Sequence, residues 1–396
     1  MLRLTHPLWQ AAYRPLFFCA GLWALLAPAV WLWPGGYGGD PVGWHLYELV
    51  FGMGGAAVGG YLLTALPSWT GGGPVPPRRV RALAILWVLA RLAWPLVGVV
   101  PVWLVLGLAL GYFVFLAAIL AAAIIRARAW SRLIFPIVVA VLAMADAALL
   151  ARHAGGLAIG PGTIAPVLIF AFLHNIIGGR AVPAFSESWR YKSGGAGRIN
   201  TPRALVAAPA ALIATAAGLM LAGRDDLAGW LLPVAAGLQA LNMTGWQVLR
   251  AEPYPALRML QAAWLWSPVG LLLLGGALLR PQMIQPATAV HALTMGAMGT
   301  MILAISARAA MRRHGAKLLA GPGLSVAFVL VWLSPLVRLL HPYVAFSGFD
   351  PVIVSAAIWM AGWATFLWAF RPALRGAVPS PVLSARLAPQ RGRPRK

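Results

Sequence analysis

Basic residues in this chain gather on every second connection between its hydrophobic runs, and this alternation restricts the fold more than any other feature. Runs of about 20 apolar residues, the length that crosses a bilayer, centre near residues 24, 55, 90, 113, 142, 173, 212, 238, 267, 297, 329 and 360. If each run is a membrane helix and the N-terminus is cytoplasmic, 26 of the 31 Lys and Arg fall on the cytoplasmic side. Four fall outside, namely Arg152, Arg224, Arg280 and Arg338. Because basic loops stay in the cytoplasm during insertion, the sequence predicts an all-α, polytopic membrane protein with 12 transmembrane helices and both termini cytoplasmic.

Composition agrees with a membrane protein and excludes several other classes. Hydrophobic residues make up 61% of the chain, charged residues 10%, and the mean hydropathy is +0.80. The net charge of +23 is spread through the predicted cytoplasmic loops, where anionic lipid headgroups attract it, so the predicted partner is the lipid bilayer and not nucleic acid. Cys19 is the single cysteine, which excludes disulfides within the chain and covalent c-type haem attachment.

The predicted domain organisation is simple. Residues 1–371 form a single 12-helix transmembrane domain, and residues 372–396 form a basic, Pro/Arg-rich cytoplasmic tail that is predicted to be disordered. No phosphate-binding loop is present in the sequence, which argues against ATP-driven transport by this chain.

Polar residues inside hydrophobic runs are the candidates for function, and the first group lies in the run near residue 55. His45, Glu48 and Gly52 follow helical spacing and share one face. Glycines on such a face let another helix, or a flat macrocycle, approach the backbone closely. The alternative is plain helix packing beneath an interfacial histidine.

The second group lies in the run near residue 297. His291, Met295 and Met298 form one stripe on a regular α-helix, a possible imidazole and thioether ligand set for haem iron or copper. Methionines in apolar helices more often serve as packing material, whereas a lone imidazole in hydrocarbon needs a partner. His291 is therefore the preferred ligand of this stripe.

His174 lies near the middle of its run, deeper than His45 and His291. Three interpretations remain open for it: a metal ligand, a proton-path residue, or a hydrogen bond to Asn175. His153 and His341, at predicted outer helix ends, are weaker candidates, and His6 and His314 are predicted to be solvated in the cytoplasm.

Arg91 and Asp146 are lone charges within hydrophobic runs. An unpaired charge in the membrane interior is costly, so the simplest prediction is an ion pair between them. The alternative is that Arg91 neutralises a haem propionate.

Five blocks of sequence together resemble the NnrS family. They are Tyr13-Arg14-Pro15-Leu16-Phe17-Phe18, Trp44-His45-x-x-Glu48-x-x-Phe51-Gly52, the segment 63–71 (LTALPSWTG), the segment 179–185 (GRAVPAF) and the segment 291–301 (HALTMGAMGTM). They occur in this order across the chain, and the twelve-helix count agrees.

The resemblance implies a bacterial inner (cytoplasmic) membrane protein that contains haem and copper and is associated with nitric oxide metabolism, nitrosative stress and denitrification. The family's motif histidines correspond to His45 and His291. Tyr47 stands where many relatives are expected to carry a second histidine, which weakens the case for copper at this helix. The resemblance does not distinguish an enzyme from a sensor or a metal handler.

The leading functional prediction is a non-covalent haem b, or a haem–copper site, in the outer leaflet, which binds or helps detoxify nitric oxide or a related small molecule, or transfers electrons. His45, His291 and His174 are the predicted cofactor ligands, with Glu48, Arg91 and Gly52 as further cofactor contacts. Met295 joins the three histidines as a predicted metal ligand. The alternative is a copper or small-molecule transporter or metal-delivery protein; the sequence identifies neither an electron donor nor an oligomeric state.

Overall fold

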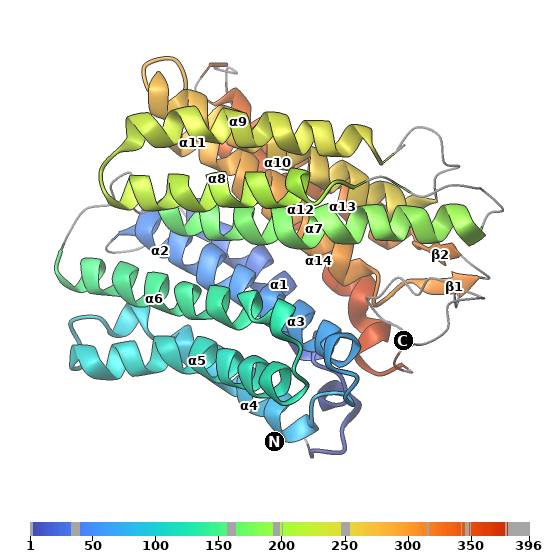
Figure 1. Ribbon diagram of the computed structural model, residues 1–396. Helices are drawn as coiled ribbons and strands as arrows, with labels where there is room; N and C mark the ends of the chain where they lie inside the picture. The colour runs from blue at the N-terminus through green and yellow to red at the C-terminus, as the bar shows by residue number, and fades with distance from the viewer. Residues whose placement is uncertain are drawn as a thin grey trace.

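The computed structural model of the 396-residue chain describes residues 3–32, 40–156, 164–192, 199, 201–246, 254–314, 317–341, 343–344, 348, 350–376 and 378. Long helices run side by side and form one bundle (Figure 1). A small antiparallel hairpin pairs Arg312 with Leu319 and His314 with Lys317.

The helices and strands have the following bounds: α1 Tyr13–Leu26, α2 Pro41–Tyr47, α3 Gly55–Thr70, α4 Pro77–Ala90, α5 Val102–Arg126, α6 Ile134–Ala154, α7 Ala165–Lys192, α8 Ala204–Leu221, α9 Asp225–Thr244, α10 Pro255–Leu279, α11 Pro286–His291, α12 Thr300–Ala307, β1 Arg312–His314, β2 Lys317–Leu319, α13 Pro322–Leu340 and α14 Pro351–Phe370. Two π-helices, η3 Glu48–Gly54 and η7 Ala292–Gly299, join α2 to α3 and α11 to α12. Short 3₁₀-helices are η1 Pro7–Trp9, η2 Ala27–Trp31, η4 Trp94–Leu96, η5 Trp130–Arg132 and η8 Arg371–Leu374.

The prediction of an all-helical fold with many membrane-length helices is confirmed. Within the described residues, ten helical segments are long and apolar enough to cross a membrane. Helices α4 and α9 are not among these ten: α4 ends after 14 residues, and α9 carries Asp225 and Asp226 in its first turn. The total of twelve spans therefore stays a prediction.

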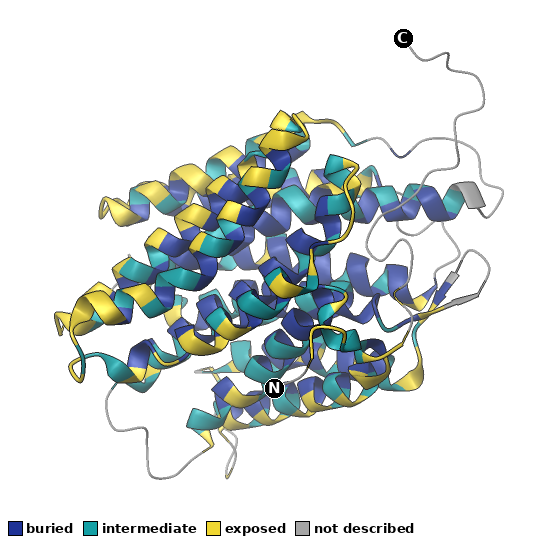
Figure 2. Ribbon diagram, turned by 90° about the horizontal axis from the view of Figure 1, so that it is seen from below, coloured by how far each residue is buried: buried dark blue, intermediate teal, exposed yellow. Residues whose placement is uncertain are grey.

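Side-chain exposure shows which surfaces face lipid. The outward faces of the bundle are exposed while the inner faces are buried (Figure 2). Large apolar side chains cover these outward faces, including Trp103, Val114, Leu221, Trp230 and Leu272. A surface of this kind is unfavourable in water and suits a hydrocarbon environment.

The first and last long helices pack against each other. The Trp359 indole of α14 donates a hydrogen bond of 2.8 Å to the Ala24 carbonyl of α1. Arg14 of α1 donates to the Pro7 carbonyl at 2.6 Å and also to the Gly376 carbonyl. The start of α1 and the residues after α14 therefore lie at the same end of the bundle. The predicted disordered tail lies outside the described residues except for residues 372–376 and 378.

The two π-helices change the register of the helices that carry the candidate histidines. Hydrogen bonds in a π-helix run from residue i to i+5, and such insertions are rare and frequent at functional sites. Segment η3 begins three residues after His45, and η7 begins directly after His291. The stripe of His291, Met295 and Met298 expected on a regular α-helix is therefore not preserved.

Candidate functional site

Helix α2 places His45 close to the end of η2. Asp40 caps this helix by accepting a hydrogen bond of 2.8 Å from the Gly43 amide, and Pro41 occupies its first turn. The Trp31 indole Nε1–H donates to His45 Nδ1 at 3.2 Å, and the two rings are edge-on with centroids 5.5 Å apart. Because Nδ1 accepts this bond, a neutral His45 carries its proton on Nε2.

His291 has the opposite tautomer. Its Nδ1 lies 2.6 Å from the carbonyl oxygen of Ala287, one turn earlier. A carbonyl can only accept, so Nδ1 carries the proton and Nε2 of a neutral His291 keeps its lone pair. A histidine that binds a metal is commonly oriented by this kind of Nδ1–H bond to a backbone carbonyl.

The two histidines lie near each other although they are distant in sequence. His45 and His291 are within electrostatic range of one another, and Arg338 is within range of both. The Thr288 hydroxyl donates to the His341 carbonyl at 3.2 Å, which holds the end of α13 against α11. Arg338 therefore stands beside the histidine pair, and we name His45, His291 and Arg338 the histidine cluster.

Arg338 supplies a positive charge to this cluster. Its Nη1 is buried and has no hydrogen-bond partner within the described residues. A buried guanidinium nitrogen without an acceptor is costly, so this atom is suited to bind an anionic oxygen. Sequence reasoning missed Arg338 as a site residue, although an arginine on the predicted outer side was a visible signal.

The histidine cluster lies at the end of the bundle opposite the Arg14–Gly376 contact. Helix α1 starts at the Arg14 end and leads into η2, which ends at Trp31. His45 binds Trp31, so the cluster is one helix length away from Arg14. This agrees with the sequence prediction that His45 and His291 contribute to one site.

Glu48 and Arg91 form a buried ion pair. Arg91 Nη1 lies 2.6 Å from Glu48 Oε2, which also accepts a hydrogen bond from the Trp23 indole. The guanidinium carbon of Arg91 stands 5.3 Å from the centre of the Tyr47 ring and 5.6 Å from that of Trp87. Both charges are thereby partnered within the protein.

This pair corrects two expectations. Arg91 is not within a helix but at the C-cap of α4, where it faces η3. Its ion-pair partner is Glu48 and not Asp146, so the predicted Arg91–Asp146 ion pair was wrong. Arg91 reaches Glu48 because Gly52 leaves room: a Cβ on Gly52 would lie 2.8 Å from Arg91 Nη1.

Asp146 lies next to this pair. It is fully buried on α6, within electrostatic range of Arg91 and Glu48. The Tyr47 hydroxyl is also buried and faces the Asp146 carboxyl group as a hydrogen-bonding group. Tyr47 therefore faces a carboxyl group and not the histidine cluster.

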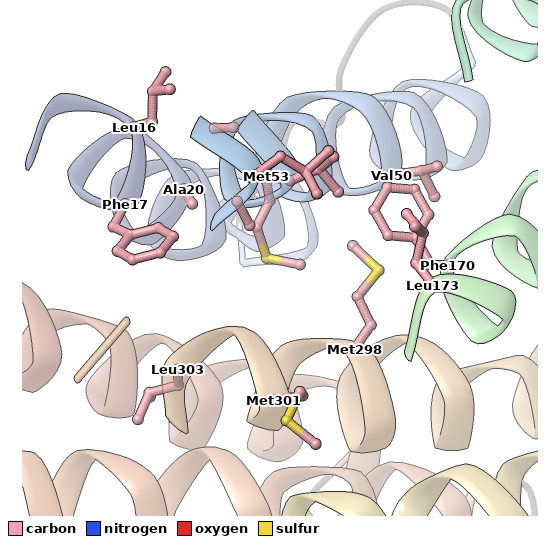
Figure 3. Close-up of a cluster of buried hydrophobic side chains, with 14 of the residues drawn as sticks. Leu16, Phe17, Ala20, Val50, Met53, Phe170, Leu173, Met298, Met301 and Leu303 are labelled. Atoms are coloured by element: carbon pink, nitrogen blue, oxygen red, sulfur yellow. The ribbon is translucent and has the colours of Figure 1, made fainter. Parts of the chain in front are cut away.

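His174 lies apart from the histidine cluster, beside a small cavity. The cavity has a volume of about 80 Å³, and His174, Met298 and Met301 are among the residues that line it. Figure 3 shows Met298 reaching from η7 toward the helix that carries Val50 and Met53. In the described part of the structure, neither ring nitrogen of His174 has a hydrogen-bond partner.

The surroundings of His174 decide between some of its predicted roles. Asn175 donates to the Val206 carbonyl at 2.8 Å and accepts from Gln239 at 3.1 Å. The alternative hydrogen bond from His174 to Asn175 is therefore not formed, and the His174 ring instead faces Trp264 at 5.1 Å. Met295 is not among the residues that line the cavity, and its role as a ligand stays a prediction.

Two of the weaker histidine candidates contact neighbouring groups of the protein. The His153 ring stacks on Trp94, with centroids 3.9 Å apart and planes 15° apart. His6 accepts a hydrogen bond of 3.2 Å from the Leu8 amide. Within the described residues, no three His, Cys, Asp or Glu side chains are grouped around a possible metal position.

Comparison with known proteins places these features in a family. The family described as NnrS protein matches residues 7–377. The chain belongs to the NnrS family. Membership links it to the response to nitric oxide. None of the curated proteins matches the chain.

The NnrS motif residues divide into two kinds in this structure. His45 and His291 stand in the histidine cluster, whereas Arg14 joins the two ends of the chain through backbone carbonyls. Glu48 and Gly52 build the Arg91 ion pair. The motifs thus combine candidate ligands with residues that shape the helices around them.

Proposed function

We propose that this NnrS-family chain binds haem b at the histidine cluster and takes part in the nitric oxide response by binding nitric oxide or a related species there. The observation that carries the proposal is the chemistry of His291, whose Nδ1 bond to Ala287 leaves the Nε2 lone pair for a metal. Haem iron, when bound, supplies the affinity for nitric oxide and a change of oxidation state. Cys19 is the single cysteine, so the two-cysteine motif of c-type haem attachment is missing and the haem is non-covalent.

The donor set suggests a different role for each member of the cluster. His291 would hold the haem iron through its Nε2 lone pair. His45 is held by Trp31 at Nδ1 and by the Ala27 backbone, so it is suited to line the position of a bound ligand and not to bind the iron. Arg338 lies within electrostatic range of Asp350, but its Nη1 has no hydrogen-bond partner among the described residues and is suited to a propionate, whereas the Nη1 of Arg91 is engaged by Glu48.

These roles narrow the interpretation made from the motifs alone. Two permanent histidine ligands would fill the iron and favour electron transfer, whereas one ligand leaves a position open for nitric oxide. The tautomer of His45 supports the second arrangement. Detoxification of nitric oxide would further need an electron donor.

We also propose that the chain lies in the bacterial inner membrane with both termini in the cytoplasm. The alternation of basic loops supports this orientation, and the contact of Arg14, at the start of α1, with Gly376, after α14, agrees with it. The histidine cluster, at the opposite end of the bundle, would then face the periplasm.

Absorption spectroscopy of the full chain, purified in mild detergent, tests the haem assignment. His291→Ala should lose most of the Soret absorbance. His45→Ala should keep the haem but release nitric oxide faster than the wild type. The control His6→Ala, at the opposite end of the bundle, should match the wild type in both measurements.

Three outcomes would overturn the assignment. One is haem content unaffected by His291→Ala. Another is loss of haem in His45→Ala alone, which would exchange the two roles. The third is a low-spin spectrum of the wild type that nitric oxide does not change.

A second candidate function is handling of copper, favoured by the cavity that His174 shares with Met298 and Met301. Imidazole and thioether groups are ligands of Cu(I). Metal analysis separates the candidates: copper without haem would support this function, and haem without copper would exclude it. Under this alternative His174→Ala and Met298→Leu should each lower the copper content, whereas Met283→Leu, an exposed methionine, should not.

A further inference from the structure

The buried group of Glu48, Arg91 and Asp146 contains more carboxyl groups than cations. Arg91 pairs with Glu48 at 2.6 Å, and this pair is neutral as a unit. Asp146, fully buried on α6, has no cation within ion-pair distance in the described part of the chain. An ionised Asp146 would place an uncompensated negative charge inside the bundle, which is strongly unfavourable.

The hydrogen-bonding surroundings of Asp146 also favour its protonated form. Both Asp146 oxygens and the Tyr47 hydroxyl are buried, and the hydroxyl faces the carboxyl group as a hydrogen-bonding group. An ionised carboxylate accepts through two oxygens and donates nothing. A carboxylic acid both donates and accepts hydrogen bonds, as a tyrosine hydroxyl does. The Tyr47 hydroxyl is therefore a better match for the protonated form of Asp146 than for the carboxylate.

Asp146 lies near the C-terminal end of α6. His153 is seven residues after Asp146 and thus on the same face of this helix. The His153 ring stacks on Trp94, and Trp94 in turn lies 5.3 Å from the Tyr47 ring. His153 is only partly buried, so this stack of rings runs from Tyr47, which faces Asp146, to the exposed end of α6.

We propose that Asp146 is a proton-binding site, a carboxylic acid that keeps its proton at neutral pH and exchanges it with the aqueous phase beyond His153. The groups that face it are Tyr47 of α2, Glu48 of η3 and Arg91 at the end of α4. This inference stands independently of haem binding. If the histidine cluster carries out a reduction, Asp146, which faces Tyr47 two residues after His45, would hold one of the protons that such a reaction consumes.

Infrared spectroscopy of the full chain in mild detergent tests the proposal. The wild type at neutral pH should show the C=O stretch of a protonated carboxylic acid, and transfer to D₂O should lower its frequency. Asp146→Asn should lose this band and keep the melting temperature, because a neutral amide of the same shape replaces a neutral acid. The control Asp226→Asn, at an exposed aspartate, should keep the band.

A second variant tests the charge count. In Glu48→Gln, Arg91 loses its anion, and Asp146 should then ionise as the replacement; the band should disappear although Asp146 is present. Absence of the band from the wild type would overturn the proposal. So would a band that survives Asp146→Asn, since the proton would then belong to another carboxyl group.

Discussion

Arg91 and Glu48 are joined by an ion pair of 2.6 Å across 43 positions of sequence, with both side chains almost entirely buried. The pair ties the end of α4 to the first turn of η3. It thereby fixes the π-helical part of the helix that carries His45.

Breaking this pair from one side should cost considerable stability. Arg91→Met leaves Glu48 as a buried charge without its partner, and we expect a loss of about 3–5 kcal/mol in the free energy of unfolding. The double variant Glu48→Gln/Arg91→Met removes both charges and should lose much less. Thermal unfolding in detergent measures both, and a double variant less stable than Arg91→Met would contradict the interpretation.

Gly52 should not tolerate a side chain. A Cβ at this position would lie 2.6 Å from Trp23 Cδ1 and 2.8 Å from Arg91 Nη1. We expect Gly52→Ala to lower the free energy of unfolding by about 1–3 kcal/mol through overpacking. The matched control is Gly107→Ala in α5, where no atom lies within 4 Å and where alanine should gain up to about 1 kcal/mol. Equal changes in the free energy of unfolding for Gly52→Ala and Gly107→Ala would show that the neighbours of Gly52 move aside without loss of stability.

The hydrogen bond from Trp31 should determine whether His45 can bind a metal. Trp31→Phe removes the indole N–H that occupies His45 Nδ1, which frees this nitrogen to bind a metal. If haem lies at the histidine cluster, the absorption spectrum should shift toward the low-spin, six-coordinate form, and nitric oxide should bind more weakly. Trp230→Phe, at a side chain that is 67% exposed on α9, is the control. An unchanged spectrum in Trp31→Phe would show that this hydrogen bond does not govern coordination.

Arg338 should strengthen haem retention. Loss of a hydrogen bond to a charged group costs about 1.5–3 kcal/mol, so Arg338→Gln should weaken haem affinity roughly 10-fold to 150-fold. Titration of haem into the haem-depleted protein measures this change. Arg280→Gln, at an exposed arginine also predicted to lie on the outer side, should leave the affinity unchanged. Similar losses in the two variants would indicate a general effect of surface charge.

The helical architecture was readable from the sequence because hydrophobic length and loop charge act locally. Each predicted run contains a helix, and His45 and His291 were placed in one layer from loop charge alone. The side-chain partners were less accessible, since Arg91 was assigned to Asp146 on depth along the helix. Depth does not report which face a residue occupies, and α4 ends at Ala90 where a continuing helix was expected.

The π-helices account for another part of the difference between the sequence prediction and the structure. Nothing in the spacing of His291, Met295 and Met298 indicates an i to i+5 ladder, because tertiary packing and not local propensity selects it. The crowding around Gly296 and Gly299, where a Cβ would overlap Trp266 and Trp359, shows how closely neighbouring helices approach η7. Arg338 was missed for a related reason, as only the packing of α13 against α11 brings it to the histidines.

The contact of α1 with α14 has a consequence for biosynthesis. Helix α1 finds one of its packing partners only when α14 has been made, since the Trp359 indole donates to the Ala24 carbonyl and Arg14 donates to the Gly376 carbonyl. During translation, the face of α1 that packs against α14 must therefore contact lipid or the insertion machinery until α14 is inserted. This delay is expected for contacts between distant parts of a long chain. A ribosome that stops before residue 351 would leave the bundle open along this seam.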